Sequence, residues 1–162
     1  ATVFHHGGCG SHRQGVGVNR FTDYALRVMM HLAAANGRLM STREIADLHD
    51  AKYNHLAKVT QWLANEGYIE TIRGRSGGIA LAKQPDQICI GTLVRKLESQ
   101  TALVECMRED RGNCRLSVAC GLAVVLKDAE ESFFRTLDQV TLADVLKRKS
   151  GMFDLLISMN AK

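Results

Sequence analysis

The sequence predicts a mainly α-helical chain with a small β-hairpin, arranged as a winged helix-turn-helix domain plus a long dimerisation helix. Apolar residues recur at three- and four-residue steps in several segments, whereas only two short runs favour strands. A single proline and an aromatic fraction of 6% also favour helices over a β-sandwich. The 162 residues suffice for one compact domain, or for one domain with an added arm.

Three short helices are expected first, each marked by cap or stop signals. Thr22 is the expected cap of the first helix, and Asn36-Gly37 is expected to end it. Ser41 and Glu44 have the spacing of a capping box at the start of the second helix. Residues 49–52 predict a turn, after which a third helix has one apolar side.

Two strand-like runs follow, at residues 68–72 and 79–82, joined by the segment Arg73-Gly74-Arg75-Ser76-Gly77-Gly78. Three helices and a hairpin in this order are typical of a winged helix-turn-helix, which is a DNA-binding motif. The distribution of positive charge agrees with DNA binding by this part of the chain. Residues 19–83 contain nine Lys and Arg and six acids, whereas residues 84–162 contain eleven of each.

The second half of the chain predicts a helix at 90–97, a loop, a long helix from about Cys120, and a short helix capped by Thr141. The long helix carries an apolar stripe that we expect to be buried against a second copy of the chain. The stripe comprises Leu122, Val125, Leu126, Ala129, Phe133 and Leu137. The expected divisions are a disordered leader (1–18), the DNA-binding domain (19–85), a connecting helix and loop (86–119), and a dimerisation and C-terminal part (120–162).

The expected DNA contacts lie on the third helix, on the hairpin and at the start of the second helix. The N-terminal residues of a recognition helix face base edges, where Asn pairs with adenine and Lys donates to guanine or phosphate. Arginine on a thin loop fits the minor groove, and amides at a helix start fit a phosphate. The candidate residues are Thr42, Arg43, Tyr53, Asn54, His55, Lys58, Arg73 and Arg75.

Three of the five cysteines, Cys106, Cys114 and Cys120, lie within fifteen residues of one another. Thiolates bind soft metals and iron–sulfur clusters. A zinc finger would favour C-x2-C pairs and a nearby His, but all six histidines lie at or before position 55. The spread of the cysteines favours a 4Fe-4S cluster over a 2Fe-2S cluster, with one iron short of a protein thiolate. A cluster-free thiol or zinc regulator is the alternative. Cys89 is interpreted as a small buried hydrophobe.

Other classes of protein are not favoured by the sequence. It contains no nucleophile–base pair, phosphate-binding loop or paired carboxylates, so the chain is not expected to be an enzyme. It has neither a secretory pattern nor an apolar run near the roughly 20 residues that span a bilayer, so a cytoplasmic protein is expected.

The chain resembles the Rrf-type winged-helix iron–sulfur transcription regulators, which include NsrR-, IscR- and RirA-like branches. The residues that carry the resemblance are 21–27, 72–78, 90–98, 141–146 and the three cysteines. Phe21-Thr22-Asp23-Tyr24 and Val94-Arg95-Lys96-Leu97-Glu98 are most similar to the NsrR-like branch of nitric-oxide-sensing repressors. The resemblance implies a homodimer that binds an inverted-repeat operator in double-stranded DNA and releases it when nitric oxide attacks a 4Fe-4S cluster.

The resemblance also implies a fourth cluster ligand. In NsrR-like proteins it is an acid at the start of the first helix that reaches the cluster across the dimer, and the matching residue here is Asp23. IscR-like proteins have a His shortly after the third cysteine, where this chain has Ala123. Seven residues separate Cys106 from Cys114, a spacing closer to the iron-responsive branch, so sensing of iron status is the alternative.

Overall fold

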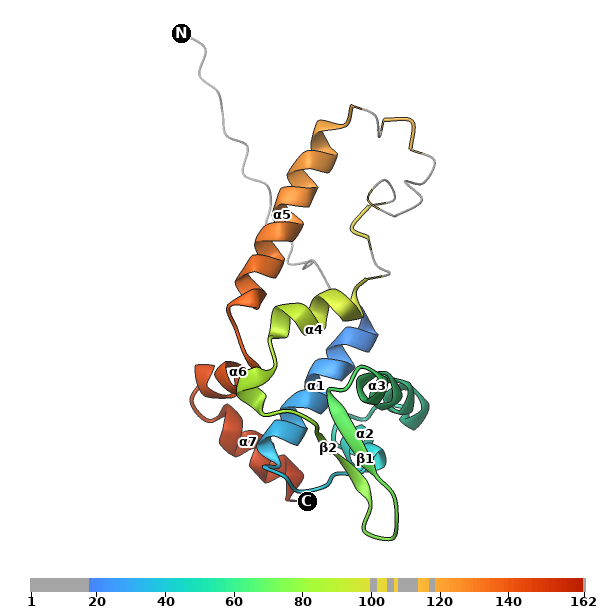
Figure 1. The fold of residues 1–162 in the computed structure, drawn as a ribbon, viewed down its shortest axis with the longest axis vertical. Helices are drawn as coiled ribbons and strands as arrows, with labels where there is room; N and C mark the ends of the chain where they lie inside the picture. Colours follow the sequence, from blue (N-terminus) through green and yellow to red (C-terminus); the bar gives the residue numbers. More distant parts are fainter. Residues whose placement is uncertain (1–17, 100–101, 105–106, 108–113, 117–118, 162) are drawn as a thin grey trace.

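The computed structural model describes residues 18–99, 102–104, 107, 114–116 and 119–161; the predicted leader (1–17 of it) and Cys106 lie outside this range. The elements are α1 (Arg20–Ala34), α2 (Thr42–Leu48), α3 (Tyr53–Asn65), β1 (Ile69–Ile72), β2 (Gly78–Leu81), η1 (Pro85–Gln87), α4 (Ile90–Leu97), α5 (Gly121–Asp138), α6 (Leu142–Arg148) and α7 (Met152–Asn160). The predicted class, mainly helical with a small antiparallel hairpin, is confirmed (Figure 1).

The helix starts follow from side-chain caps. Both predicted caps at Ser41 and Thr141 are confirmed, and each forms a reciprocal capping box. The predicted cap at Thr22 is wrong, because the side chain of Asn19 accepts a hydrogen bond from the Thr22 amide at 2.9 Å and α1 begins at Arg20. Asn is a preferred cap, so the helix starts earlier, and the Thr22 hydroxyl is buried without a partner among the described residues.

The core is built around α1, which packs against α3, α4, α6, α7 and β2. Its buried face meets apolar residues from the rest of the helix-turn-helix and from α4, chiefly Ile45, Leu56, Val59, Leu63, Leu93 and Val94. Two polar residues of α1, Thr22 and His31, are also fully buried. This arrangement leaves the opposite sides of α2 and α3 open to solvent.

The predicted hairpin follows α3, and its two strands pair antiparallel. Ile69 pairs with Leu81 and Ile72 with Gly78, so the tip comprises residues 73–77. Gly74 has φ +124°, a conformation that side chains rarely adopt, and it allows the tight tip. Hydrogen bonds between Met40 and Ile79 join the base of the hairpin to the segment before α2, so the hairpin is fixed beside the helix-turn-helix.

The long helix α5 meets the rest of the molecule at its C-terminal end and projects away from it (Figure 1). Gly91 of α4 lies against Asp138, where an added Cβ would come within 2.6 Å of the Asp138 amide nitrogen. Arg95 binds the Asp138 carboxylate at 2.8 Å and lies over the Phe134 ring. No described side chain of α5 is fully buried. In its predicted stripe Leu122, Val125 and Phe133 are exposed, whereas Leu126 is half-buried and Leu137 packs partly against the core.

Two features near the C-terminal half differ from the sequence analysis. Helix α7 was not predicted, because Met152–Asn160 is mostly apolar and its amphipathic period is weak. Its cap is Gly151, in the left-handed conformation. Cys89 is half-buried, and its thiol lies 3.5 Å from the Asp138 carbonyl oxygen, so it is not a fully buried hydrophobe.

Candidate DNA-binding surface and cysteine segment

The N-terminal end of α3 is an exposed polar surface. Lys52, which precedes α3, makes no side-chain cap hydrogen bond, so the first amides of the helix remain open. Apolar residues on the other side of α3 anchor it in the core. The predicted contact residues of this helix are all exposed, and they are Tyr53, Asn54, His55 and Lys58.

Side-chain contacts join the starts of α2 and α3. The Arg43 guanidinium lies 4.6 Å from the centre of the Tyr53 ring, so a cation–π contact brings these two predicted residues together. The Thr42 hydroxyl lies 3.4 Å from the Thr60 hydroxyl and is half-buried. The Thr42 side chain therefore contacts α3, and its open group is the backbone amide at the start of α2.

Arg73 and Arg75 lie in the exposed tip of the hairpin, beyond the last paired residues of the strands. Figure 1 shows the tip projecting past α2 and β1 away from the helical body. Because the hairpin is fixed at its base and α3 packs against β1, the two arginines and the start of α3 belong to one connected unit.

The cysteine segment connects α4 to α5 and ends at Cys120, where α5 begins; this end of α5 lies far from the hairpin (Figure 1). Cys114 and Cys120 are half-buried free thiols, and Cys106 lies outside the described residues. Cys120 is the N-cap of α5 and makes no cap hydrogen bond. A helix N-terminus stabilises a thiolate, so this position suits a negatively charged metal ligand. Among the described residues, no three His, Cys, Asp or Glu side chains gather in one place.

Asp23 lies in the first turn of α1, where Arg27 binds both of its carboxylate oxygens. The Arg27 Nη2–Asp23 Oδ2 distance is 2.8 Å, and Arg27 Nε donates to Oδ1 at 3.1 Å. Both side chains are about half-exposed, so the pair contributes little stability by itself. A metal-ligand role for Asp23 requires its carboxylate to share or leave Arg27.

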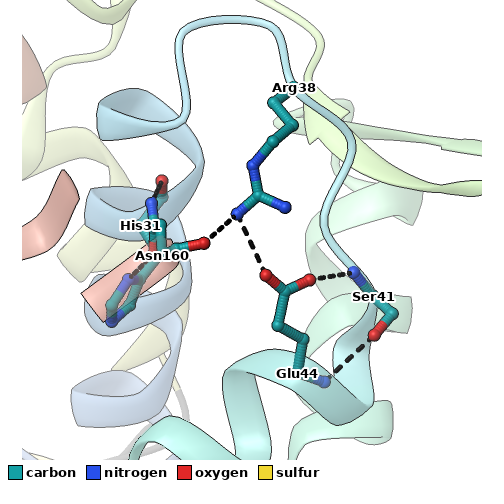
Figure 2. Close-up of polar contacts among 5 residues, drawn as sticks. All are labelled: His31, Arg38, Ser41, Glu44 and Asn160. Carbon is teal, nitrogen blue, oxygen red and sulfur yellow. Dashed lines mark hydrogen bonds and ion pairs between the residues drawn. The ribbon is translucent and has the colours of Figure 1, made fainter. Parts of the chain in front are cut away.

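The sequence analysis missed a polar cluster that connects α1, α2 and α7. It contains His31, His49 and Asn160, with Arg38 and Glu44 beside them. Figure 2 shows these residues except His49. The one signal in the sequence is His31 itself, a polar residue in a stretch that is otherwise apolar. Its partner Asn160 is 129 residues away, beyond the reach of local patterns.

The described part of the chain contains no helix that is long and apolar enough to cross a membrane.

Comparison with known proteins finds transcriptional regulators. The sequence profile of Rrf2, described as an iron-dependent transcriptional regulator, matches residues 18–148. The "HTH-type transcriptional regulator NsrR" of Halalkalibacterium halodurans is 42% identical over 137 residues, which is 84% of this chain and 94% of that protein. The regulator of the same name from Bacillus subtilis (strain 168) is 42% identical over 140 residues, covering 86% and 96%.

Solved structures agree. The T. potens IscR structure has a TM-score of 0.66 at 25% identity and covers 83% of this chain and 88% of that one. A putative transcriptional regulator from Listeria innocua has a TM-score of 0.67 at 30% identity and covers 85% and 90%. The B. subtilis global cysteine regulator CymR has a TM-score of 0.63 at 27% identity and covers 84% and 100%.

The fold and its exposed surfaces define a winged helix-turn-helix DNA-binding transcription regulator rather than an enzyme. The chain belongs to the Rrf2 family of transcriptional regulators, which confirms the resemblance predicted from the sequence.

Proposed function

We propose that this chain is a homodimeric repressor that senses nitric oxide through a 4Fe-4S cluster. One observation carries the proposal: a helix-turn-helix surface and a cysteine triplet occur together in a chain 42% identical to regulators named NsrR. In this arrangement, residues 19–85 bind DNA, residues 86–119 hold the cluster, and residues 120–162 carry the dimer interface. The 1–18 segment has no assigned role.

The DNA surface consists of the start of α3, the start of α2 and the hairpin tip. Asn54 and Lys58 are exposed on α3 where base edges would lie, with Tyr53 and His55 beside them. Arg73 and Arg75 are positioned to enter the adjacent minor groove. The open amides at Thr42 and Arg43 fit a phosphate of the same duplex.

Replacing Arg73 tests this surface. Arg73→Ala is expected to weaken binding of the duplex that the wild-type chain selects from a randomised library, by about 1–3 kcal/mol. The matched control is Arg148→Ala, which removes an exposed arginine of α6 outside this surface. Fluorescence anisotropy measures both affinities, and equal affinities for the two variants would argue against the surface.

The dimer interface is the apolar stripe of α5. Leu122 and Val125 are each 63% exposed, although large apolar side chains on a long helix are normally covered. A second copy of the stripe covers it by helix packing and gives a twofold dimer, which fits an inverted-repeat operator. Val125→Glu is expected to give monomers in analytical ultracentrifugation, whereas Lys127→Glu, on the same helix but outside the stripe, is expected to stay dimeric.

The cysteine segment supplies the cluster ligands. Cys106, Cys114 and Cys120 provide three thiolates, and the helix N-terminus at Cys120 favours their negative charge. The Asp23 carboxylate of a second copy provides a fourth, weaker oxygen ligand, in competition with Arg27. When bound, the cluster supplies an iron that nitric oxide attacks. The donor set fits such a cluster, since thiolates are its usual ligands.

Spectroscopy with DNA binding tests the sensing proposal. Anaerobically purified protein is expected to be brown, to contain iron and sulfide, and to shift the selected duplex in a gel. Nitric oxide is expected to bleach the visible absorption and abolish the shift. Zinc without iron or sulfide would refute the proposal and support a cluster-free regulator.

A second candidate function is sensing of iron status. The description of the family profile as iron-dependent favours it, as does the seven-residue gap between Cys106 and Cys114. This candidate predicts a gel shift that nitric oxide leaves unchanged and that iron chelation abolishes. The same preparation therefore distinguishes the two functions.

A further inference from the structure

Both ends of α2, the first helix of the helix-turn-helix, connect through hydrogen bonds to Asn160 in the last turn of α7. Figure 2 shows the Asn160 side chain against His31 and its main chain against Arg38. Asn160 is 9% exposed, so it is not available to contact DNA. It also lies beyond residues 18–148, the part of the chain that the family profile matches.

The N-terminal end of α2 connects to Asn160 through Arg38. One guanidinium nitrogen of Arg38 donates to the Asn160 carbonyl oxygen at 2.8 Å and to Glu44 Oε1 at 2.9 Å. The other oxygen of Glu44 accepts from the Ser41 amide and completes the capping box of α2. The first turn of α2 is therefore connected to the end of α7 by three consecutive hydrogen bonds.

The C-terminal end of α2 connects to Asn160 through two histidines, His31 and His49, which we call the histidine pair. His31 Nδ1 lies 2.6 Å from Asn160 Oδ1, and His31 Nε2 lies 2.9 Å from His49 Nε2. His49 is the C-cap of α2 and begins the turn to α3. Asp50 in that turn has φ +47°, and the Ala51 amide bonds back to α2, so the turn is tight and the position of His49 affects α3.

The hydrogen bonds fix where the protons lie. The Asn160 amide nitrogen donates to the His31 carbonyl, so Asn160 Oδ1 is an acceptor and His31 Nδ1 carries a proton. In neutral His31, Nε2 is then an acceptor, and His49 Nε2 donates to it. His49 Nδ1 remains as an acceptor for Arg27 Nη1 at 3.4 Å. Every bond is satisfied with both imidazoles neutral.

An added proton disrupts this chain at one place. Both ring nitrogens of His31 already take part in hydrogen bonds, so the added proton goes to His49 Nδ1. There it faces an Arg27 N–H and places a positive charge beside the guanidinium. Burial lowers the pKa of His31, and burial with the charges of His31 and Arg27 lowers the pKa of His49. The carboxylates of Asp23 and Glu44 face the pair and oppose this shift without reversing it.

We propose that Asn160 is a positioning residue for DNA binding, which fixes both ends of α2 and fixes the turn before α3 only while the histidine pair is neutral. The inference rests on the proposed use of α3 to contact DNA. Helix α7 thus acts as a clamp on the helix-turn-helix, and protonation of the pair releases one of its two attachments.

Two substitutions of Asn160 test the clamp, with affinity for the selected duplex measured from about pH 8 to about pH 5.5, a range around the ordinary imidazole pKa. Wild-type affinity is expected to fall about fivefold to tenfold toward acid, as one hydrogen bond is lost. Asn160→Ala is expected to bind about fivefold more weakly even at pH 8, because His31 loses its acceptor. Ser158→Ala, an exposed change in α7, is the matched control and is expected to behave as wild type.

Asn160→Asp is a second test, because it keeps the acceptor for His31 Nδ1 and adds a negative charge, while it loses the donor to the His31 carbonyl. A carboxylate beside an imidazole raises its pKa by about 1–3 units, so the acid loss is expected to move to higher pH by about one unit or more. The exposed change Gln87→Glu controls for added charge. A wild-type pH profile for Asn160→Asp would overturn the proposal.

A variant of His49 that cannot titrate gives an independent test. The His49→Gln side chain still donates to His31, so binding is expected to be within about threefold of wild type at pH 8 and to lose its acid dependence. Undiminished acid loss in this folded variant would overturn the proposal.

Nitrogen NMR of labelled histidines reports the clamp without DNA. It is expected to show His31 with its proton on Nδ1 and His49 with its proton on Nε2; the opposite tautomers would overturn the assignment. The affinity measurements also distinguish failure of the proposed DNA contact by α3 from failure of the clamp. If α3 does not contact DNA, Lys58→Ala and Asn160→Ala both bind like wild type, whereas a failed clamp leaves Lys58→Ala weak and the Asn160 variants normal.

Discussion

Gly91→Ala is expected to destabilise the protein by separating α4 from α5. A Cβ at position 91 would lie 2.6 Å from the Asp138 amide nitrogen and 2.8 Å from its Cα. Ordinary contacts of this kind begin near 3.4 Å, so the end of α5 must move by roughly 0.6–0.8 Å. Rotation of the Asp138 carboxylate cannot relieve a contact with its backbone, and the movement also strains the bond from Arg95.

The magnitude follows from two opposing terms. Alanine stabilises a helix by up to about 1 kcal/mol relative to glycine. Overpacking a close contact costs about 1–3 kcal/mol. Gly91→Ala is therefore expected to lower the free energy of unfolding by about 1–2 kcal/mol net. Gly121→Ala, where nothing lies within 4 Å of the added Cβ, is expected to raise it by up to about 1 kcal/mol.

Urea denaturation of both variants measures these changes from the transition midpoint at constant m value. The test depends on the sign of the change in the free energy of unfolding, because helix propensity alone predicts that both substitutions stabilise the protein. If Gly91→Ala stabilises the protein as Gly121→Ala does, α4 and α5 do not approach as closely as described. The described direction of α5 would then also be wrong.

Three further predictions concern the cysteines, the histidine pair and the caps. Cys114→Ala is expected to abolish bound iron and sulfide, whereas Cys89→Ala keeps both; retention of iron by Cys114→Ala would exclude it as a ligand. The free energy of unfolding is expected to fall as pH falls below about 6.5, because the lowered pKa values of His31 and His49 mean that the unfolded chain binds more protons there. His49→Gln is expected to reduce that slope in urea titrations at several pH values, and an unchanged slope would contradict the assignment. Ser41→Ala is expected to cost roughly 1 kcal/mol in the same assay by removing the α2 cap, and a neutral result would contradict the role of the capping box.

Local chemistry explains why much of the fold was predictable. Ser41 with Glu44, and Thr141 with Asp144, satisfy the first amides of their helices within four residues, so spacing alone identifies both helix starts. The hairpin tip needs a residue with positive φ, and Gly74 meets that need. The apolar residues of α3 and of the strands are buried in one core. The predicted contact residues between them therefore remain on the exposed side.

The missed features depend on contacts between distant residues. Helix α7 is mostly apolar with a weak amphipathic period, so periodicity does not distinguish it from an apolar loop, and its position against α1 decides its structure. His31 pairs with residues 18 and 129 positions away, which no local pattern indicates. Thr22 and Asn19 are both cap residue types three positions apart. Only the path of the chain into α1 shows that Asn19 is the cap, since its side chain accepts from the Thr22 amide.

The two ends of the cysteine segment bear on how it communicates with the DNA surface. The segment follows Glu98, the C-cap of α4, and Glu98 accepts hydrogen bonds from both the amide and the side chain of Asn19, the cap of α1. It ends at Cys120, the cap of α5. A change in this segment therefore acts first on the start of α1 and the start of α5. Because α1 forms the centre of the core beneath α3, we expect the route to DNA to pass through α1 rather than along α5, whose main packing partner is α4.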